Sequence, residues 1–307
     1  DGHAPGVAGQ DLMAYLAAGP ESDHEAVTLA EGEEKLRLGM WLMIREGSAS
    51  RNLEALAPLL RSELRHRCLL VSDDLEPSDL LERGHLDHLL RRAVALGTAP
   101  LDAVRAVTIN VAQRFGLAHV GAIAPGYAAD IVAVDGLERF EVGTVLRRGT
   151  VLKHGGRWVA ADAAPVSASA AVRDSVRLAL PTAEQLAIRA SGDGPVLVRV
   201  IEAQEGLIVT ESTEAQLPVR DSCVQADPSQ DVLKLAVIER HGRSGNIGLG
   251  FVRGFGLREG ALATTVAHDS HNLLLAGADD QSLATAAAAI KRLGGGHVVA
   301  RGDRVLA

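Results

Sequence analysis

The feature that most limits the possible folds of this sequence is the alternation of short apolar runs with helical patterns over its first 120 residues. Residues 40–44 and 68–71 are uninterrupted apolar runs, as expected for strands buried on both faces of a sheet. Residues 86–94 instead repeat apolar side chains every three or four positions, which predicts an amphipathic helix. The alternation predicts βα units and a parallel sheet, and therefore an α/β fold.

We count about four such units, whereas a closed eight-stranded α/β barrel takes about 250 residues. An open four-stranded sheet would need its edges covered. We therefore expect residues 1–120 to form half of a barrel of the TIM type. The sequence also has no initiator Met and ends on an apolar run, so we expect it to be part of a longer polypeptide.

The pattern changes after residue 120. Short apolar runs at 130–134, 142–146, 151–152 and 158–159 predict a small β-module, and the Ala-, Ser- and Pro-rich residues 160–172 predict a linker. An α+β region is expected from about residue 175, with strands at 196–201, 206–209, 232–238, 261–267 and 273–275. Its clearest helix should begin after the N-cap residue Asp279 and end before Gly294.

The charge balance excludes several classes of partner. With 31 Lys and Arg against 39 Asp and Glu, the net charge is −8, so the basic footprint needed for nucleic acid or for an anionic membrane surface is absent. No run approaches the roughly 18 apolar residues of a membrane helix, and the start of the sequence lacks the layout of a secretion signal. We expect a cytoplasmic protein whose two cysteines, Cys68 and Cys223, are small buried residues.

Three polar side chains follow predicted strands in the barrel half: His3, His24 and Asp73. The carboxyl ends of barrel strands form the catalytic rim, so these residues are candidate ligands or bases. Two imidazoles and a carboxylate would suit a borderline divalent cation. A lone His or Asp after a strand is, however, more often a turn former or a helix cap, and each of the three could be one.

Other motifs are less specific. His85 and His88 could share a helix face as metal ligands or form a solvated pair, and His268 and His271 lie in a polar stretch that is either a turn or the edge of a site. The glycines between residues 245 and 256 do not match a phosphate-binding GxGxxG pattern. The HxE…PCxxC signature of cytidine-type zinc deaminases is absent from the sequence.

Several of these segments resemble adenine deaminases of the amidohydrolase superfamily, in the family's order and over nearly the whole chain. Asp1–Gly6, Ser22–Glu25, Lys35–Met40, Met43–Ser48, Ser72–Asp74 and Gly84–Asp87 are similar to the second half of the catalytic barrel. Gly121–Gly126 and Ala129–Val132 resemble the small β-sandwich, and Glu239–His241, Gly250–Val252 and Val266–Asn272 resemble the C-terminal domain of this family.

The resemblance implies domains at residues 1–120, 121–165 and 175–307. It implies His3, His24 and Asp73 as metal ligands, with Asp73 also moving a proton during hydrolytic deamination of adenine to hypoxanthine and ammonia, in purine salvage. The family's His-x-His pair and bridging Glu have no counterpart here, so the first half of the barrel would be missing. The implied cofactor is a divalent metal (Mn, Fe or Zn), binuclear in the complete enzyme.

We also expect His85, His268 and His271 to line the substrate pocket and the protein to form homo-oligomers, with a small molecule as substrate and neither nucleic acid nor membrane as partner. Two alternatives remain open. A different amidohydrolase, acting on a cyclic amide or another aminopurine, would keep the same metal residues. A non-catalytic fragment would keep the fold without the activity.

Overall fold

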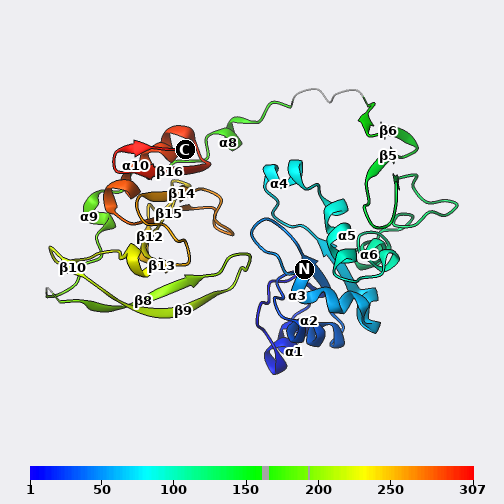
Figure 1. Ribbon diagram of the computed structural model, residues 1–307, viewed down its shortest axis with the longest axis horizontal. Helices are drawn as coiled ribbons and strands as arrows, with labels where there is room; N and C mark the ends of the chain where they lie inside the picture. The colour runs from blue at the N-terminus through cyan, green and yellow to red at the C-terminus, as the bar shows by residue number, and fades with distance from the viewer. Residues whose placement is uncertain (161–165, 193) are drawn as a thin grey trace. The chain divides into compact units, whose positions relative to one another are not determined.

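The computed structural model describes residues 1–160, 166–192 and 194–307. The chain forms two compact units (Figure 1). The first unit comprises Asp1–Ala163 with Gly206–Ile208, and the second comprises Ala164–Glu205 with Val209–Ala307. Part of the predicted linker, residues 161–165, lies outside the described residues. Among the helices that are described, none is both long and apolar enough to cross a membrane.

A parallel sheet of three strands lies at the centre of the first unit, in the order β1 (Ser22–Asp23), β2 (Trp41–Arg45) and β3 (Cys68–Val71). The strands predicted at residues 40–44 and 68–71 are confirmed to within one residue, and Ile44 pairs with Leu70. A single parallel bridge joins Gly2 to Asp23, where the sequence analysis expected a strand ending before His3. The parallel strands of the α/β prediction are therefore present.

Helices connect and cover these strands. Leu36 of α2 (Leu29–Arg37), Leu42 and Ile44 of β2, and Leu89 of α5 (Leu86–Ala95) belong to one buried core. The helical segments of this unit are α1 (Gly9–Ala17), α2 (Leu29–Arg37), α3 (Leu53–Leu56), the 3₁₀ helices η1 (Ala57–Arg61) and η2 (Glu63–Arg67), α4 (Pro77–Glu82), α5 (Leu86–Ala95), α6 (Pro100–Ala106) and α7 (Ile109–Arg114).

A single helix from Pro100 to about Phe115, as the sequence pattern suggests, is not formed. The chain turns at Val107 and Thr108, between α6 and α7, and the Thr108 hydroxyl donates to the carbonyl oxygen of Val104 at 2.7 Å. The break lets the buried Asn110 amide donate to the carbonyl oxygen of Cys68 at 2.9 Å, where β3 begins. Tertiary hydrogen bonding thus overrides the local helical pattern.

The β-module of residues 131–158 is a four-stranded antiparallel sheet in the order β4-β5-β6-β7. Its strands are β4 (Ile131–Val134), β5 (Val142–Arg147), β6 (Thr150–His154) and β7 (Arg157–Trp158), in agreement with the predicted strand positions. Arg148 and Gly149 both have positive φ, as in the two-residue turns typical of hairpins. Phe140, in the loop before β5, is buried.

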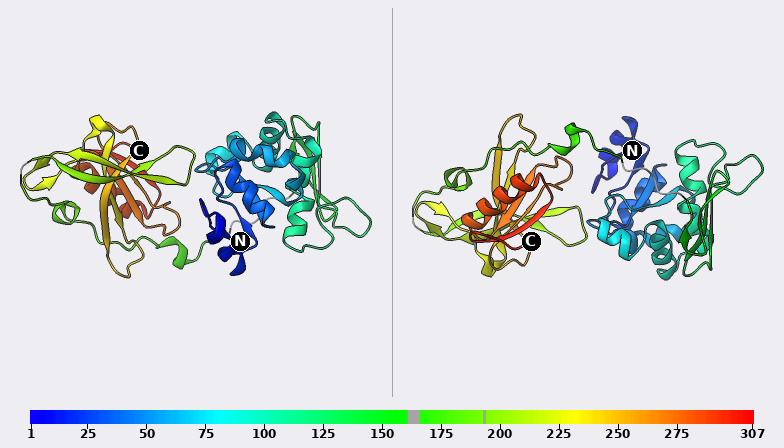
Figure 2. Two further views of the ribbon diagram at one scale, coloured as in Figure 1. Left: turned by 90° about the horizontal axis from the view of Figure 1, so that it is seen from below. Right: turned by 90° about the horizontal axis from the view of Figure 1, so that it is seen from above.

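The second unit contains an eight-stranded sheet in the order β17-β16-β14-β15-β12-β13-β8-β9. Figure 2 shows helix α10 (Asp280–Leu293) against one face of this sheet. The strands are β8 (Val196–Ala203), β9 (Thr210–Leu217), β12 (Val232–Ile238), β13 (Ile247–Arg253), β14 (Ala261–Thr264), β15 (Leu273–Gly277), β16 (His297–Arg301) and β17 (Arg304–Val305). Smaller elements are the helices α8 (Ala170–Arg173) and α9 (Ala183–Leu186), the 3₁₀ helix η3 (Pro228–Gln230), and the strand pair β10 (Val219–Arg220) and β11 (Cys223–Val224).

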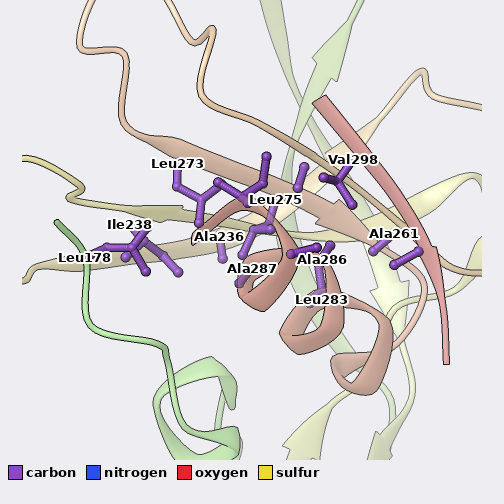
Figure 3. Close-up of a cluster of buried hydrophobic side chains, with 14 of the residues drawn as sticks. Leu178, Ala236, Ile238, Ala261, Leu273, Leu275, Leu283, Ala286, Ala287 and Val298 are labelled. Carbon is purple, nitrogen blue, oxygen red and sulfur yellow. The ribbon is translucent and has the colours of Figure 1, made fainter. Parts of the chain in front are cut away.

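Helix α10 confirms its predicted boundaries. The carboxylate of Asp279 accepts the backbone amide of Ser282 at 2.8 Å, and Gly294 ends the helix with a φ of 79°. Leu283, Ala286 and Ala287 lie on the face of the helix that packs on the sheet (Figure 3). The apolar face and the two capping residues of α10 all lie within the helix or next to its ends, so the sequence alone could predict the helix.

Two expectations for this part of the chain are wrong, a strand at residues 206–209 and the burial of Cys223. Residues 205–206 form a turn rather than part of a strand at 206–209, because Gly206 has a φ of 77° between β8 and β9. Residues 247–253, which the sequence patterns did not identify as a strand, form β13, which is hydrogen-bonded to β12 along its whole length. The Cys223 side chain is also only half-buried, although Cys68 is fully buried.

Candidate metal centre

His3 and His24 lie side by side at the carboxyl edge of the parallel sheet. The bridge between Gly2 and Asp23 aligns the residues that follow them, so the two imidazoles meet edge to face with ring centroids 4.6 Å apart. The Nδ1 atom of His3 is 3.0 Å from Oε1 of Glu25. One ligand atom from each of His3, His24 and Glu25 lies within 4.8 Å of the other two, which is a spacing that could hold a metal ion.

The buried imidazole of His24 is placed between two carboxylates. Its Nε2 atom is 3.4 Å from Oδ2 of Asp73, and its Nδ1 atom is 3.1 Å from Oδ2 of Asp1. Within the described part of the chain, Nδ1 has no hydrogen bond of good geometry despite being buried. His24 therefore contacts both other residues that the sequence analysis selected as ligands, His3 and Asp73.

Asp73 leaves the end of β3 in the left-handed conformation, with a φ of 55°. Its Oδ2 atom is 3.4 Å from Nη1 of Arg45, whose side chain is 8% exposed at the end of β2. The other terminal nitrogen of Arg45 binds the Asp74 carboxylate. Arg45 thus fixes both acids after β3, and Asp73 is the one that remains beside His24.

The loop after β2 approaches the loop after β3 closely at Gly47. A Cβ atom on this residue would lie 2.4 Å from the carbonyl oxygen of Ser72 and 2.6 Å from that of Asp74. The amide of Ser48 also donates to the Asp74 carbonyl oxygen at 2.9 Å. Only glycine fits here, because both neighbours are backbone atoms that frame Asp73.

His85 lies at the start of α5 and is connected to the strand end that carries Asp73. Its Nε2 atom is 2.9 Å from the hydroxyl of Ser72, the residue before Asp73. His88 has a different environment: desolvation, followed by the charges of Arg91, Arg83 and Arg92, lowers its pKa. Three nearby guanidinium groups disfavour a cation beside His88.

His268 and His271 belong to the second unit, in the loop between β14 and β15. Their rings pack edge to face with centroids 4.8 Å apart. Arg240 donates to the carbonyl oxygen of His271, and Nε2 of His241 is 3.1 Å from the carbonyl oxygen of Ser270. The loop is thus fixed by side chains that follow β12, and the predicted role of the two histidines in substrate binding stays a prediction.

Sequence reasoning missed three charged residues near the centre: Glu25, Arg45 and Lys35. Glu25 and Arg45 stood inside motifs that resemble the family, directly after His24 and at the end of the apolar run 40–44. Lys35 is fully buried. Lys35 likewise begins the motif Lys35–Met40, so all three residues lay in segments that resemble the family. The burial of Lys35 had no such signal, because nothing local distinguishes a buried lysine from an exposed one on an amphipathic helix.

Comparisons with known proteins agree with the resemblance. Residues 6–158 match the amidohydrolase family, and residues 207–307 match the adenine deaminase C-terminal domain. Adenine deaminase of Methanothermobacter thermautotrophicus is 48% identical over 99% of this chain and 54% of its own length, and adenine deaminase of Methylobacterium nodulans is 47% identical over 100% and 53%. The chain thus spans about half the length of the curated relatives it matches.

Solved structures also show similarity to this chain. The beta-aspartyl dipeptidase of Fervidobacterium islandicum AW-1 is 19% identical, with a TM-score of 0.40 over 52% of this chain and 48% of that one. A triazine hydrolase variant is 16% identical, with a TM-score of 0.28 over 49% of this chain and 47% of that one. By its family matches, the chain belongs to the amidohydrolase family over residues 6–158 and carries an adenine deaminase C-terminal domain over residues 207–307.

Proposed function

We propose that this chain is part of an enzyme that hydrolytically deaminates adenine to hypoxanthine and ammonia with the help of a divalent metal. The observation that carries the proposal is the contact of His24 with both His3 and Asp73 at one edge of the parallel sheet of an amidohydrolase domain. The match of residues 207–307 to the adenine deaminase C-terminal domain supports adenine as the substrate.

The residues present fit a divalent cation. Imidazole nitrogens and carboxylate oxygens suit Zn²⁺, Mn²⁺ and Fe²⁺, and the buried Nδ1 of His24 lacks a well-formed hydrogen bond among the described residues. We propose His3, His24 and Asp73 as ligands, with Glu25 offering a further carboxylate beside His3. A bound divalent cation lowers the pKa of water toward neutrality and so supplies a nucleophile at pH 7.

Asp73 is the residue that we propose as the proton carrier. Its carboxylate is one-third exposed, so a substrate and a water molecule can reach it. It accepts a proton from the attacking water and returns it to the amino group on C6 of adenine, which leaves as ammonia. Arg45 orients this carboxylate, because its Nη1 atom lies 3.4 Å from Oδ2 of Asp73.

The finer features of the enzyme are part of the same proposal. The parallel order β1-β2-β3 supports a place for this sheet in a TIM-type barrel, of which residues 1–120 would be the second half. We further propose a binuclear centre in the complete enzyme, substrate contacts from His85, His268 and His271, a homo-oligomer, and a cytoplasmic role in purine salvage. The contact between His85 and Ser72 supports His85 in particular, because Ser72 precedes Asp73.

The test is an ultraviolet assay of adenine conversion to hypoxanthine with added Mn²⁺, Fe²⁺ or Zn²⁺. It uses this chain and a version extended at its N-terminus to supply a His-x-His pair and a bridging Glu. We expect activity in the extended protein, and its loss on Asp73→Asn but not on Asp303→Asn, an acid near the end of the chain. An extended protein that hydrolyses a cyclic amide but not adenine would overturn the substrate, and one inert on both would favour the non-catalytic alternative.

A further inference from the structure

A lysine is completely buried beneath the candidate metal centre. The Lys35 side chain of α2 is 0% exposed, and its ammonium group is bound by three oxygens. The Nζ atom is 2.6 Å from the carbonyl oxygen of Ala4, 3.0 Å from Oδ2 of Asp23 and 2.7 Å from Oε1 of Glu31. Each of the three N–H groups of the ammonium therefore has an acceptor on a different segment.

Asp23 connects this ammonium group to the backbone around both histidines. Its Oδ1 atom accepts the amide of Ala4 at 3.0 Å, directly after His3. Its Oδ2 atom accepts the amide of Glu25 at 3.2 Å, directly after His24. One fully buried carboxylate thus holds the residues that follow the two candidate ligands.

Glu31 forms a second connection between the same two loops. Its Oε1 atom accepts the amide of Gly6 at 2.8 Å, and its Oε2 atom accepts the amide of Val27 at 3.1 Å. Lys35 and Glu31 are one turn apart on α2, so the helix presents both charges to the loops. Residues 4–6 and 25–27 are therefore fixed to one helix by charge-assisted hydrogen bonds.

We propose that Lys35, Asp23 and Glu31 form a positioning cluster that fixes the loops carrying His3, His24 and Glu25 in the geometry for binding a divalent cation. The proposal rests on the proposed function, because it takes that cation as the ligand. A buried ion pair is a weak source of stability compared with apolar packing, since desolvation offsets much of the attraction. Its directional bonds do, however, fix the relative positions of two loops, and metal ligands require placement to within about half an ångström.

The central test is Glu31→Gln in the 307-residue chain. The new amide keeps the size of the side chain and one acceptor oxygen, but it removes the charge and places an NH₂ group opposite an amide donor, at Val27 or Gly6. The matched control is Glu33→Gln on the same helix, where the carboxylate pairs with the exposed Arg37. Circular dichroism and urea unfolding establish that each variant is folded before metal binding is measured.

Calorimetric titration with Zn²⁺ is the main readout, and the absorption spectrum of added Co²⁺ is the second. We expect Glu31→Gln to weaken Zn²⁺ binding about 10- to 100-fold, the usual effect of losing a group that orients a ligand, and to alter the Co²⁺ spectrum. Glu33→Gln should match the parent in both. Faster hydrogen exchange at residues 4–6 and 25–27 of metal-free Glu31→Gln should accompany the loss.

The outcomes separate this proposal from the proposed function. Folded Glu31→Gln and Asp23→Asn variants that bind Zn²⁺ like the parent would overturn the positioning cluster alone. If the parent binds Zn²⁺ but the N-terminally extended protein leaves adenine unchanged, the proposed substrate is overturned. Weaker Zn²⁺ binding by Glu31→Gln would still support the positioning cluster in that case. A parent that binds no divalent cation would overturn both.

Discussion

The Nε2 atom of His24 lies 3.4 Å from the Oδ2 atom of Asp73, although β1 and β3 are separated by β2 in the sheet. Neighbouring strands lie about 4.8 Å apart, so residues at the ends of β1 and β3 begin about 10 Å apart. The two side chains nevertheless meet, and Arg45 at the end of the intervening strand β2 binds Asp73. The parallel sheet therefore brings the candidate ligands to one edge.

Replacing His24 should nearly abolish metal binding. His24→Ala removes the imidazole that contacts both His3 and Asp73, so we expect Zn²⁺ affinity to fall by more than about 100-fold, beyond the usual effect of losing a supporting residue. Calorimetric titration measures the change. His66→Ala, which removes an exposed imidazole on η2, is the control and should bind like the parent. Equal affinity in both variants would remove His24 from the ligand set.

Arg45 should matter more to stability than an exposed arginine. Arg45→Met leaves the carboxylates of Asp73 and Asp74 without their buried partner, and hydrogen bonds to charged groups contribute about 1.5–3 kcal/mol each. We expect the free energy of unfolding in urea to fall by about 2 kcal/mol or more. The control is Arg37→Met, whose exposed pair with Glu33 should contribute about 0.5 kcal/mol or less. A similar loss in the two variants would contradict the expectation.

Gly47→Ala should displace the loop that carries Asp73. The added methyl group meets the backbone oxygens of Ser72 and Asp74, which cannot move aside as a flexible side chain would. Overpacking of this kind costs about 1–3 kcal/mol, so we expect reduced unfolding stability together with weaker Zn²⁺ binding. Gly136→Ala, where an added Cβ meets no atom within 4 Å, is the matched control. Parent-like stability in Gly47→Ala would show that the loops separate easily.

Glu239 should make the second unit sensitive to acid. Desolvation acts to raise the pKa of its carboxyl group, but backbone amides of Gly245, Arg243, Ser244 and His241 outweigh it and lower the pKa from 4.5 to about 2. The folded state therefore binds the proton more weakly than the unfolded state. The resulting stability is present above pH 4.5 and is lost as the pH falls toward 2.

Urea unfolding between pH 7 and pH 3, followed for the parent and Glu239→Gln, measures this effect. The parent should lose stability as the pH falls through this range, and the variant should be less stable at pH 7 but change less with pH. Glu259→Gln removes a carboxylate from an exposed pair with Arg301 and should keep the parent's pH profile. If the stability of the parent and of Glu239→Gln changed with pH in the same way, the lowered pKa of Glu239 would be refuted.

The two cysteines should differ in reactivity. Burial raises the pKa of the Cys68 thiol to about 12, so almost none of the reactive thiolate exists at pH 8. Cys223 is only half-buried. Iodoacetamide should therefore label Cys223 in the native protein and Cys68 only after unfolding, as mass spectrometry of the peptides can establish. Rapid native labelling of Cys68 would mean that the sheet around β3 opens readily.

Local patterns in the sequence determined the strands and the best helix. The uninterrupted apolar runs at residues 40–44 and 68–71 could be recognised because a strand buried on both faces needs no polar residue. Asp279 and Gly294 marked the ends of α10, because the capping chemistry of a helix lies within a few residues of its ends. The motifs around His3, His24 and Asp73 likewise sufficed to recognise the family that the comparisons confirm.

Only the tertiary structure decided which charged groups surround the candidate centre and how some segments fold. Residues 247–253 contain glycines that disfavour a strand, yet β12 supplies hydrogen-bond partners along the whole of β13. Lys35 and Arg45 are buried because carboxylates distant in the sequence compensate their charge. Such charge compensation requires segments that are distant in the sequence to come into contact, and these contacts exist only in the folded chain.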